Sequence, residues 1–169
     1  MKKLKLLAVL FVVAFVFSAC QNVESKKSIV TNFNADFTAS NENFKAEGSI
    51  TAENGETELI FTSPKTINGL KICNGGGEIS LEIDNLVSTA DEAYLPKDNM
   101  PQLIHSVATD VSGGREILYQ KNDEFDTYIL ETSKGKCTYA VDKNGYIRSA
   151  QINSKNFRID FFNQLALSE

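Results

Sequence analysis

Alternation of apolar and polar side chains with a period of two residues runs through most of this chain. From Phe33 to Ala39 every second residue is apolar and the residues between them are polar. Successive side chains of a β-strand point to opposite faces, so this pattern predicts a strand with one buried face. A helix would scatter the same apolar residues around its axis. The chain is therefore expected to fold mainly from half-buried strands.

The alternation recurs in short segments that are separated by turn residues. Asn54-Gly55 is typical of a two-residue hairpin turn, and the run from Asn74 to Gly77 lies between two further strands. Short strands with such turns predict an antiparallel sheet of about ten or eleven strands, connected mostly as a meander. The predicted strands are 33–39, 44–52, 59–61, 67–73, 79–83, 117–120, 127–132, 136–141, 146–152 and 157–162.

One segment in the middle of the chain has a helical period instead. Leu103, Ile104 and Val107 recur at spacings of three and four residues, which places them on one face of a helix of roughly ten residues. Pro101 suits the first turn of this helix, and Gly113-Gly114 follows its end. It is the one convincing helix after the first twenty residues.

A sheet of about ten strands cannot stay flat, because the twist of each strand accumulates until the sheet curls, splits or closes. Curling creates a concave apolar face, and the helix around 100–111 has an apolar stripe that can cover it. We expect a mainly β domain with a curved sheet and a helical lid. Periodicity alone favours a solid core, and the alternative is a hollow that shelters an apolar ligand. The expected lining residues are Phe37, Phe44, Ile50, Leu59, Phe61, Leu81 and Ile83 from the sheet, with Leu103, Ile104 and Val107 from the lid.

The start of the chain carries a different pattern. Three lysines precede an uncharged run of 14 residues from Leu6 to Ala19, which is typical of an export signal. As a helix, that run would rise about 21 Å, less than the roughly 30 Å hydrocarbon core of a bilayer. We therefore expect residues 1–19 to be a signal peptide and not a permanent membrane span.

The end of this run, Phe17-Ser18-Ala19-Cys20, resembles the lipobox of bacterial lipoproteins, with phenylalanine where leucine is usual. The resemblance implies cleavage before Cys20 and diacylation of its sulfur, and two acyl chains hold a protein stably on a membrane. Residues 20–28 then form a polar, flexible tether, and 29–169 form one domain. We expect an extracytoplasmic protein anchored to the bacterial membrane through Cys20. An ordinary secretory signal that is cut elsewhere is the alternative.

The chain beyond the expected signal is acidic. It holds 14 Lys and Arg residues against 22 Asp and Glu residues, a net charge of −8. Nucleic-acid binding needs clustered positive charge, so no nucleic-acid partner is expected. Cys73 and Cys137 lie in strand-like segments, where they either form one disulfide or remain as small buried side chains.

Residues suited to catalysis or metal binding do not form a recognisable motif. His105 is the one histidine, which excludes a metal site of several histidines, and it is expected on the helical lid or the surface. The carboxylate pairs Asp91-Glu92 and Glu124 with Asp126 lie in predicted loops, where acidic side chains are usually solvated. The run from Asp142 to Gly145 resembles half of a calcium loop, but a hairpin turn explains it. We expect no enzymatic activity, no cofactor and no metal.

Three segments carry a resemblance to a known superfamily: Phe44 to Ile50, with its glycine; Leu59 to Pro64, which ends in proline; and Ile67 to Leu70. Together they resemble the bacterial lipoprotein carriers and receptors of the LolA-like half-barrel type and the mycobacterial glycolipid-binding lipoproteins. The resemblance implies a half-open barrel that holds a lipid or an acyl chain under helices.

The arginine that gates the carriers has no counterpart here, since the arginines are Arg115, Arg148 and Arg158. The resemblance therefore favours a lipid-binding or regulatory role over lipoprotein transfer. The alternative is a non-enzymatic envelope lipoprotein that has no ligand and docks or regulates a partner protein through a sheet edge or its acidic surface.

Overall fold

A computed structural model describes residues 28–96 and 98–167 of the 169-residue chain. The predicted signal peptide, Cys20 and the tether up to residue 27 lie outside the described residues. In chain order the described elements are β1 (Phe33–Ser40), β2 (Lys45–Glu53), β3 (Glu56–Ser63), η1 (Lys65–Ile67), β4 (Lys71–Gly75), β5 (Glu78–Ile83), β6 (Leu86–Asp91), η2 (Glu92–Tyr94), α2 (Met100–Thr109), β7 (Arg115–Gln120), β8 (Asp126–Thr132), β9 (Gly135–Val141), β10 (Ile147–Ile152), η3 (Asn153–Lys155) and β11 (Phe157–Ala166).

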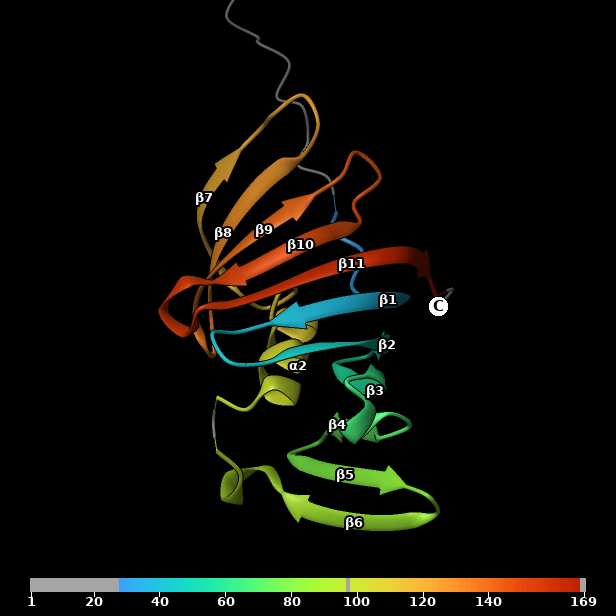
Figure 1. The fold of residues 1–169 in the computed structure, drawn as a ribbon. Helices are drawn as coiled ribbons and strands as arrows, with labels where there is room; N and C mark the ends of the chain where they lie inside the picture. Colours follow the sequence, from blue (N-terminus) through green and yellow to red (C-terminus); the bar gives the residue numbers. More distant parts are fainter. Residues whose placement is uncertain (1–27, 97, 168–169) are drawn as a thin grey trace, which may run out of the picture.

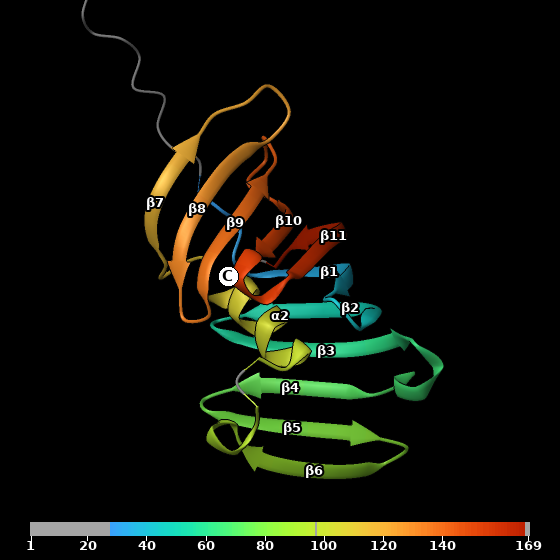
Figure 2. The same cartoon turned by 60° about the vertical axis from the view of Figure 1, so that its left-hand side comes forward.

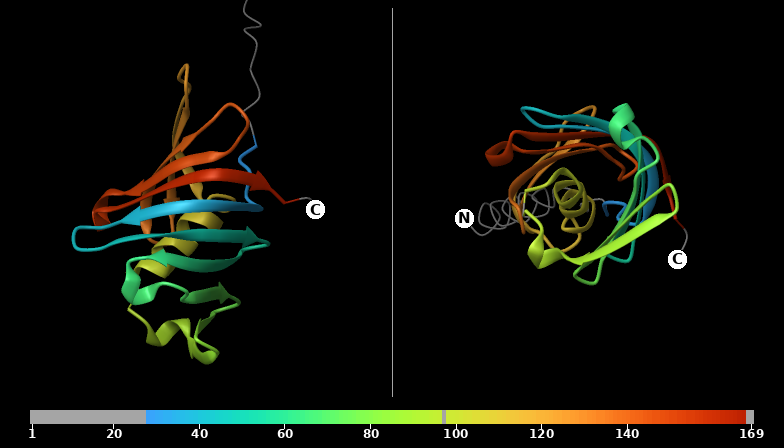
Figure 3. Two further views of the ribbon diagram at one scale, coloured as in Figure 1. Left: turned by 45° about the vertical axis from the view of Figure 1, so that its right-hand side comes forward. Right: turned by 60° about the horizontal axis from the view of Figure 1, so that its bottom comes forward.

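All eleven strands belong to one antiparallel sheet with the order β6-β5-β4-β3-β2-β1-β11-β10-β9-β8-β7 (Figure 1). Two meanders, β1 to β6 and β7 to β11, meet where β1 pairs with β11, so β6 and β7 form the two edges. The sheet bends around α2, which the right-hand view of Figure 3 shows most clearly. The expected mainly β half-barrel with a helical lid is confirmed.

The alternation in β1 explains why the concave face is apolar. Phe33, Ala35, Phe37 and Ala39 are all buried, whereas the residues between them are exposed or half-buried. Across the core the rings of Phe37 and Phe61 meet edge to face, with their centroids 5.8 Å apart. The interior of the half-barrel is therefore a packed aromatic and aliphatic core.

Helix α2 begins where the sequence predicts it. The Asn99 side chain caps it by accepting a hydrogen bond from the Gln102 amide at 2.9 Å, and Pro101 occupies the first turn. Besides its apolar stripe, the helix buries the polar residues Gln102 and Ser106. Figure 2 shows α2 on the concave side, where it packs on β3 and β4. Helix α2 therefore lies inside the curve of the sheet and covers much of its concave face.

Hydrogen bonds tie α2 to the other half of the sheet. The buried Tyr139 hydroxyl on β9 donates to the Val107 carbonyl at 3.2 Å. Just beyond the helix, the Asp110 carboxylate accepts from the backbone amide of Ser133, in the β8–β9 turn, at 2.9 Å. The helix is thus fixed at its C-terminal end.

The turn between β9 and β10 receives the start of the described chain. The Val30 amide donates to the Gly145 carbonyl at 2.9 Å. In the same turn Asp142 accepts from the amides of Asn144 and Tyr146 and from the Arg148 guanidinium. Burial alone would raise the pKa of Asp142, but these donors together lower it. The carboxylate organises a hairpin turn, as the sequence predicts.

Candidate functional site

An apolar pocket of about 210 Å³ lies on the concave side, between the sheet and the segment that leads into α2. Only apolar atoms form its surface. Ile72 and Leu81 are register partners in β4 and β5 and form part of the floor. Leu81 and Leu95 are half-buried, so the pocket opens to solvent beside them. The lining residues are Ile72, Ile79, Leu81, Leu95, Pro96, Asn99 and Pro101.

The hydrogen bonds of Asn99 explain why the segment that leads into α2 contributes only apolar atoms to the pocket, although it contains polar residues. Its side-chain oxygen accepts from the Gln102 amide at 2.9 Å, and its side-chain nitrogen donates to the Pro96 carbonyl at 2.8 Å. Both polar ends of the amide are therefore used in holding Pro96 against the first turn of α2. Only carbon atoms of this capped turn are therefore left to face the pocket.

Short helix η2 fastens the other end of this segment. The Glu92 amide donates to the Gly77 carbonyl, in the β4–β5 turn, at 2.9 Å. Asp91 caps η2 by accepting from the Ala93 amide at 2.8 Å, and the Leu95 amide closes it by donating to the Glu92 carbonyl. The segment that leads into α2 is thus held at one end by η2 and at the other by the cap at Asn99.

The ten residues expected to line a ligand site fall into three groups. Seven of them are buried between the sheet and α2: Phe37, Ile50, Leu59, Phe61, Leu103, Ile104 and Val107. Leu81 and Ile83 are half-buried, and Leu81 is the member of the set that lines the apolar pocket. Phe44 precedes β2 and is 39% exposed, so it does not belong to the buried set.

Phe44 lies in a local turn. The Asn41 side chain accepts hydrogen bonds from the amides of Asn43 and Phe44 at 3.1 and 3.0 Å. This side-chain turn holds Phe44 just before the strand begins, where the chain is more exposed than at Ala46. The signal was present in the sequence as an asparagine in the link between two alternating runs.

Polar groups are also buried under α2, further along the same face. The Thr57 hydroxyl and Nδ1 of His105 are hydrogen-bonded at 2.9 Å. Burial lowers the pKa of His105, although Glu92 and Asp110 act in the opposite direction. Next to Thr57 in the β3–β4 register lies Asn74, which is 2% exposed. Helix α2 and the sheet therefore also meet in a polar contact, apart from the apolar pocket.

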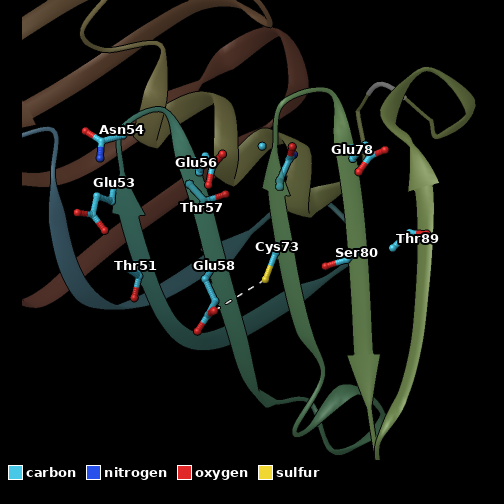
Figure 4. Close-up of a pocket in the computed structure, with 12 residues that line it drawn as sticks. Thr51, Glu53, Asn54, Glu56, Thr57, Glu58, Cys73, Glu78, Ser80 and Thr89 are labelled. Atoms are coloured by element: carbon cyan, nitrogen blue, oxygen red, sulfur yellow. Dashed lines mark hydrogen bonds between the residues drawn. The ribbon is translucent and has the colours of Figure 1, made fainter.

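A second hollow, of about 400 Å³, crosses strands β2 to β6 and is lined mainly by polar and acidic residues (Figure 4). The register of these strands aligns Thr51, Glu58, Cys73, Ser80 and Thr89 in one row. Such a surface suits polar or cationic partners and does not suit an acyl chain.

Carboxylates form the next row of this hollow. Glu53 pairs with Glu56, and Glu78 pairs with Asp91. The Glu56 side chain crosses Gly75, where a Cβ atom would lie 2.6 Å from its Cγ. The row therefore brings four acidic side chains onto one face.

Cys73 and Cys137, the two cysteines among the described residues, do not form a disulfide. Cys73 on β4 is half-buried, and its thiol lies 3.8 Å from a Glu58 carboxylate oxygen. Cys137 on β9 is fully buried, which raises the pKa of its thiol to about 11. Cys137 is thus a core side chain, whereas Cys73 faces the acidic hollow.

The candidate catalytic residues have structural contacts of their own. Besides Asp91, which caps η2, Asp126 accepts a hydrogen bond from the Tyr119 hydroxyl at 3.2 Å. In residues 28–96 and 98–167, no three His, Cys, Asp or Glu side chains gather as a metal site. Over the same residues, no helix is long and apolar enough to cross a membrane.

Neither a family model nor a curated protein sequence matches this chain. Among solved structures, a LolA superfamily protein from Nitrosomonas europaea aligns with a TM-score of 0.44 and 10% identity, over 82% of this chain and 86% of that one. The lipoprotein LppX from Mycobacterium tuberculosis aligns with a TM-score of 0.39 and 13% identity, over 80% and 85%. The Pseudomonas aeruginosa MucA/MucB complex gives 0.41 and 14%, over 82% of this chain and 53% of the matched chain. These values assign the chain to no family.

Proposed function

We propose that this protein is a non-enzymatic, extracytoplasmic lipoprotein, anchored through Cys20, that binds the end of an acyl chain in the apolar pocket beside α2. The pocket carries the proposal, because its surface holds only apolar atoms and it lies between the sheet and the segment that leads into α2. Its volume of about 210 Å³ is below the roughly 300–1,000 Å³ of pockets that enclose a drug-sized ligand. It therefore takes the end of one chain and leaves the rest of the lipid outside.

The packing of α2 explains why the ligand is limited to this pocket. Leu103, Ile104 and Val107 are buried against the sheet, so the helix already occupies the centre of the concave face. The apolar pocket beside Leu81 and Leu95 is left open to solvent. A ligand enters there without the cost of moving a packed helix.

A series of saturated fatty acids of increasing length tests this binding mode. Each methylene withdrawn from water contributes roughly 0.8 kcal/mol, so adding two carbons should tighten binding about tenfold while the pocket still has room. Beyond that length the affinity should level off. The chain from Gln21 onward keeps every described element and avoids the anchor, so its affinities can be measured by displacement of the fluorescent fatty acid cis-parinaric acid.

A matched pair of variants locates the site. Leu81→Trp fills the pocket and should weaken fatty-acid binding at least tenfold. Leu165→Trp makes the same change at a residue of β11 that is 67% exposed, and should leave binding unchanged. Equal affinities of wild type and Leu81→Trp, with both proteins folded by near-ultraviolet circular dichroism, would refute the proposal.

A further inference from the structure

Strand β6 ends the sheet with an unprotected edge. It pairs with β5 over six consecutive residues without a register shift, and no described residue pairs with its other side. Five of its six residues are exposed, with Leu86 at 72% and Val87 at 66%. An edge of this kind presents free backbone N–H and C=O groups, which are a template for another strand.

The opposite edge of the sheet is different. The pairing of β7 with β8 shifts register between Glu116 and Leu118, and β7 opens with the charged pair Arg115-Glu116. Bulges and charges are the usual means by which proteins protect an edge. Strand β6 has no lysine, no proline and no register shift. Of the two edges, β6 is the one suited to strand addition.

The hairpin register determines which backbone groups of β6 are free. Ile83 and Leu86 flank a two-residue turn, and the Glu92 amide donates to the Gly77 carbonyl. Hydrogen-bonded and non-hydrogen-bonded pairs alternate along an antiparallel ladder, so both observations place residues 86, 88 and 90 in bonds to β5. The backbone groups of Val87, Thr89 and Asp91 therefore point away from the sheet.

The charge beside this edge selects the chemistry of its partner. Glu78 and Glu82 are register partners of Asp91 and Val87, and both are exposed. The segment from Glu53 to Glu92 holds eight acidic residues and two lysines, and Lys71, one of the two, pairs with Glu58 at 2.7 Å. Strands lie roughly 4.8 Å apart, so a strand added to β6 would lie within about one Debye length of these carboxylates.

We infer that β6 docks an extended, basic segment of a partner protein by strand addition, with lysine or arginine at alternate positions. The basic side chains lie on the face that carries Glu78 and Asp91, and the residues between them lie beside Leu86, Ser88 and Ala90. A second copy of this chain is a poor occupant, because each copy carries the same acidic face. The first described residues are bonded to the β9–β10 turn, in the other half of the sheet. Strand β6 therefore lies far from the start of the described chain (Figure 1).

Fluorescence anisotropy of a labelled hexapeptide, Lys-Val-Lys-Val-Lys-Val, tests the docking with the full chain in nonionic detergent. The expected result is binding that weakens with added salt and is at least tenfold tighter than binding of Glu-Val-Glu-Val-Glu-Val. Methylating alternate backbone nitrogens of the Lys-Val peptide should abolish binding. Equal binding of the acidic and basic peptides, or of the methylated peptide, would overturn the inference.

Thr89 offers a matched pair of variants on the protein side. Thr89→Pro removes an outward N–H without touching a bond to β5, and proline is tolerated at such edge positions. It should weaken peptide binding at least tenfold, whereas Thr89→Val should retain it. Charge reversal at Glu78 and Glu82 to lysine, which leaves β6 intact, should weaken binding to a similar extent.

Three outcomes would contradict this assignment: wild-type binding in Thr89→Pro, no effect of charge reversal, or sedimentation that shows a dimer lost in Thr89→Pro. The last would make a second copy the occupant of β6. Peptide binding should persist in Leu81→Trp, which separates this surface from the apolar pocket.

Discussion

Nδ1 of His105 lies 2.9 Å from the hydroxyl oxygen of Thr57, which joins the helix inside the half-barrel to the strand beneath it. The apolar stripe of α2, which includes Leu103, Ile104 and Val107, is also buried. The pair therefore gives this interface a defined registry, because a shifted helix would leave two polar atoms without partners.

Protonation of His105 should weaken the fold at acidic pH. Its pKa is lowered below 6.5 in the folded protein, so the unfolded chain takes up a proton first as the pH falls. Stability should be fully present above pH 6.5 and should decrease as the pH falls from 6.5 to the folded pKa. Urea unfolding at pH 7.5, 6.5 and 5.5 measures this decrease, and His105→Gln should show a smaller one. Identical pH profiles would contradict the assignment.

Removing the partner hydroxyl tests the same contact at neutral pH. Thr57→Val keeps the volume of the side chain but leaves the imidazole nitrogen without its partner. We expect a loss of about 1 kcal/mol in the free energy of unfolding. In His105→Gln the effect of Thr57→Val should shrink if the two side chains act together, and a double-mutant cycle measures that coupling.

Most strands could be predicted from the sequence. Each central strand of the curled sheet has one buried face, and its apolar residues therefore alternate with polar ones. From Phe33 to Ala39 the apolar residues are the buried ones, as the alternation requires. Strand β6 escaped prediction because five of its six residues are exposed, so neither face imposes a pattern. Edge strands of this kind are held by backbone pairing, which side-chain periodicity does not report.

The candidate site was less accessible to sequence reasoning. Periodicity identifies the apolar stripe of α2, but the burial of Gln102 and Ser106 follows from a sheet that wraps around the helix. The pocket depends on Leu95, Pro96 and Asn99, which belong to an aperiodic segment. Its shape comes from the hydrogen bonds of Asn99, which are a property of the folded backbone.

Gly48 should be intolerant of any side chain. A Cβ atom there would lie 2.2 Å from the Ile60 carbonyl oxygen on the neighbouring strand. Gly48→Ala must push β3 away from β2, which we expect to cost about 1–3 kcal/mol. Gly113→Ala is the matched control, because no atom lies within 4 Å of its Cβ position. Thermal unfolding of both variants would contradict this view if Gly48→Ala were the more stable one.

The two cysteines of the domain should react at very different rates. Cys137 is fully buried and its pKa is raised to about 11, so little thiolate exists at pH 8. Cys73 is half-buried and free. With the chain from Gln21, iodoacetamide at pH 8 should label Cys73 within minutes and Cys137 only after unfolding. Rapid labelling of folded Cys73→Ser would show that the strand around Cys137 opens.

The most direct measurement of ligand binding is photo-crosslinking with a fatty acid that carries a diazirine at the end of its chain. After irradiation with the chain from Gln21, peptide mass spectrometry should find the label within residues 72–81 and 95–101. Excess unlabelled fatty acid and the Leu81→Trp variant should both remove it. Label spread over exposed apolar residues such as Leu118, Phe162 and Leu165, with none in the pocket, would contradict the proposed function.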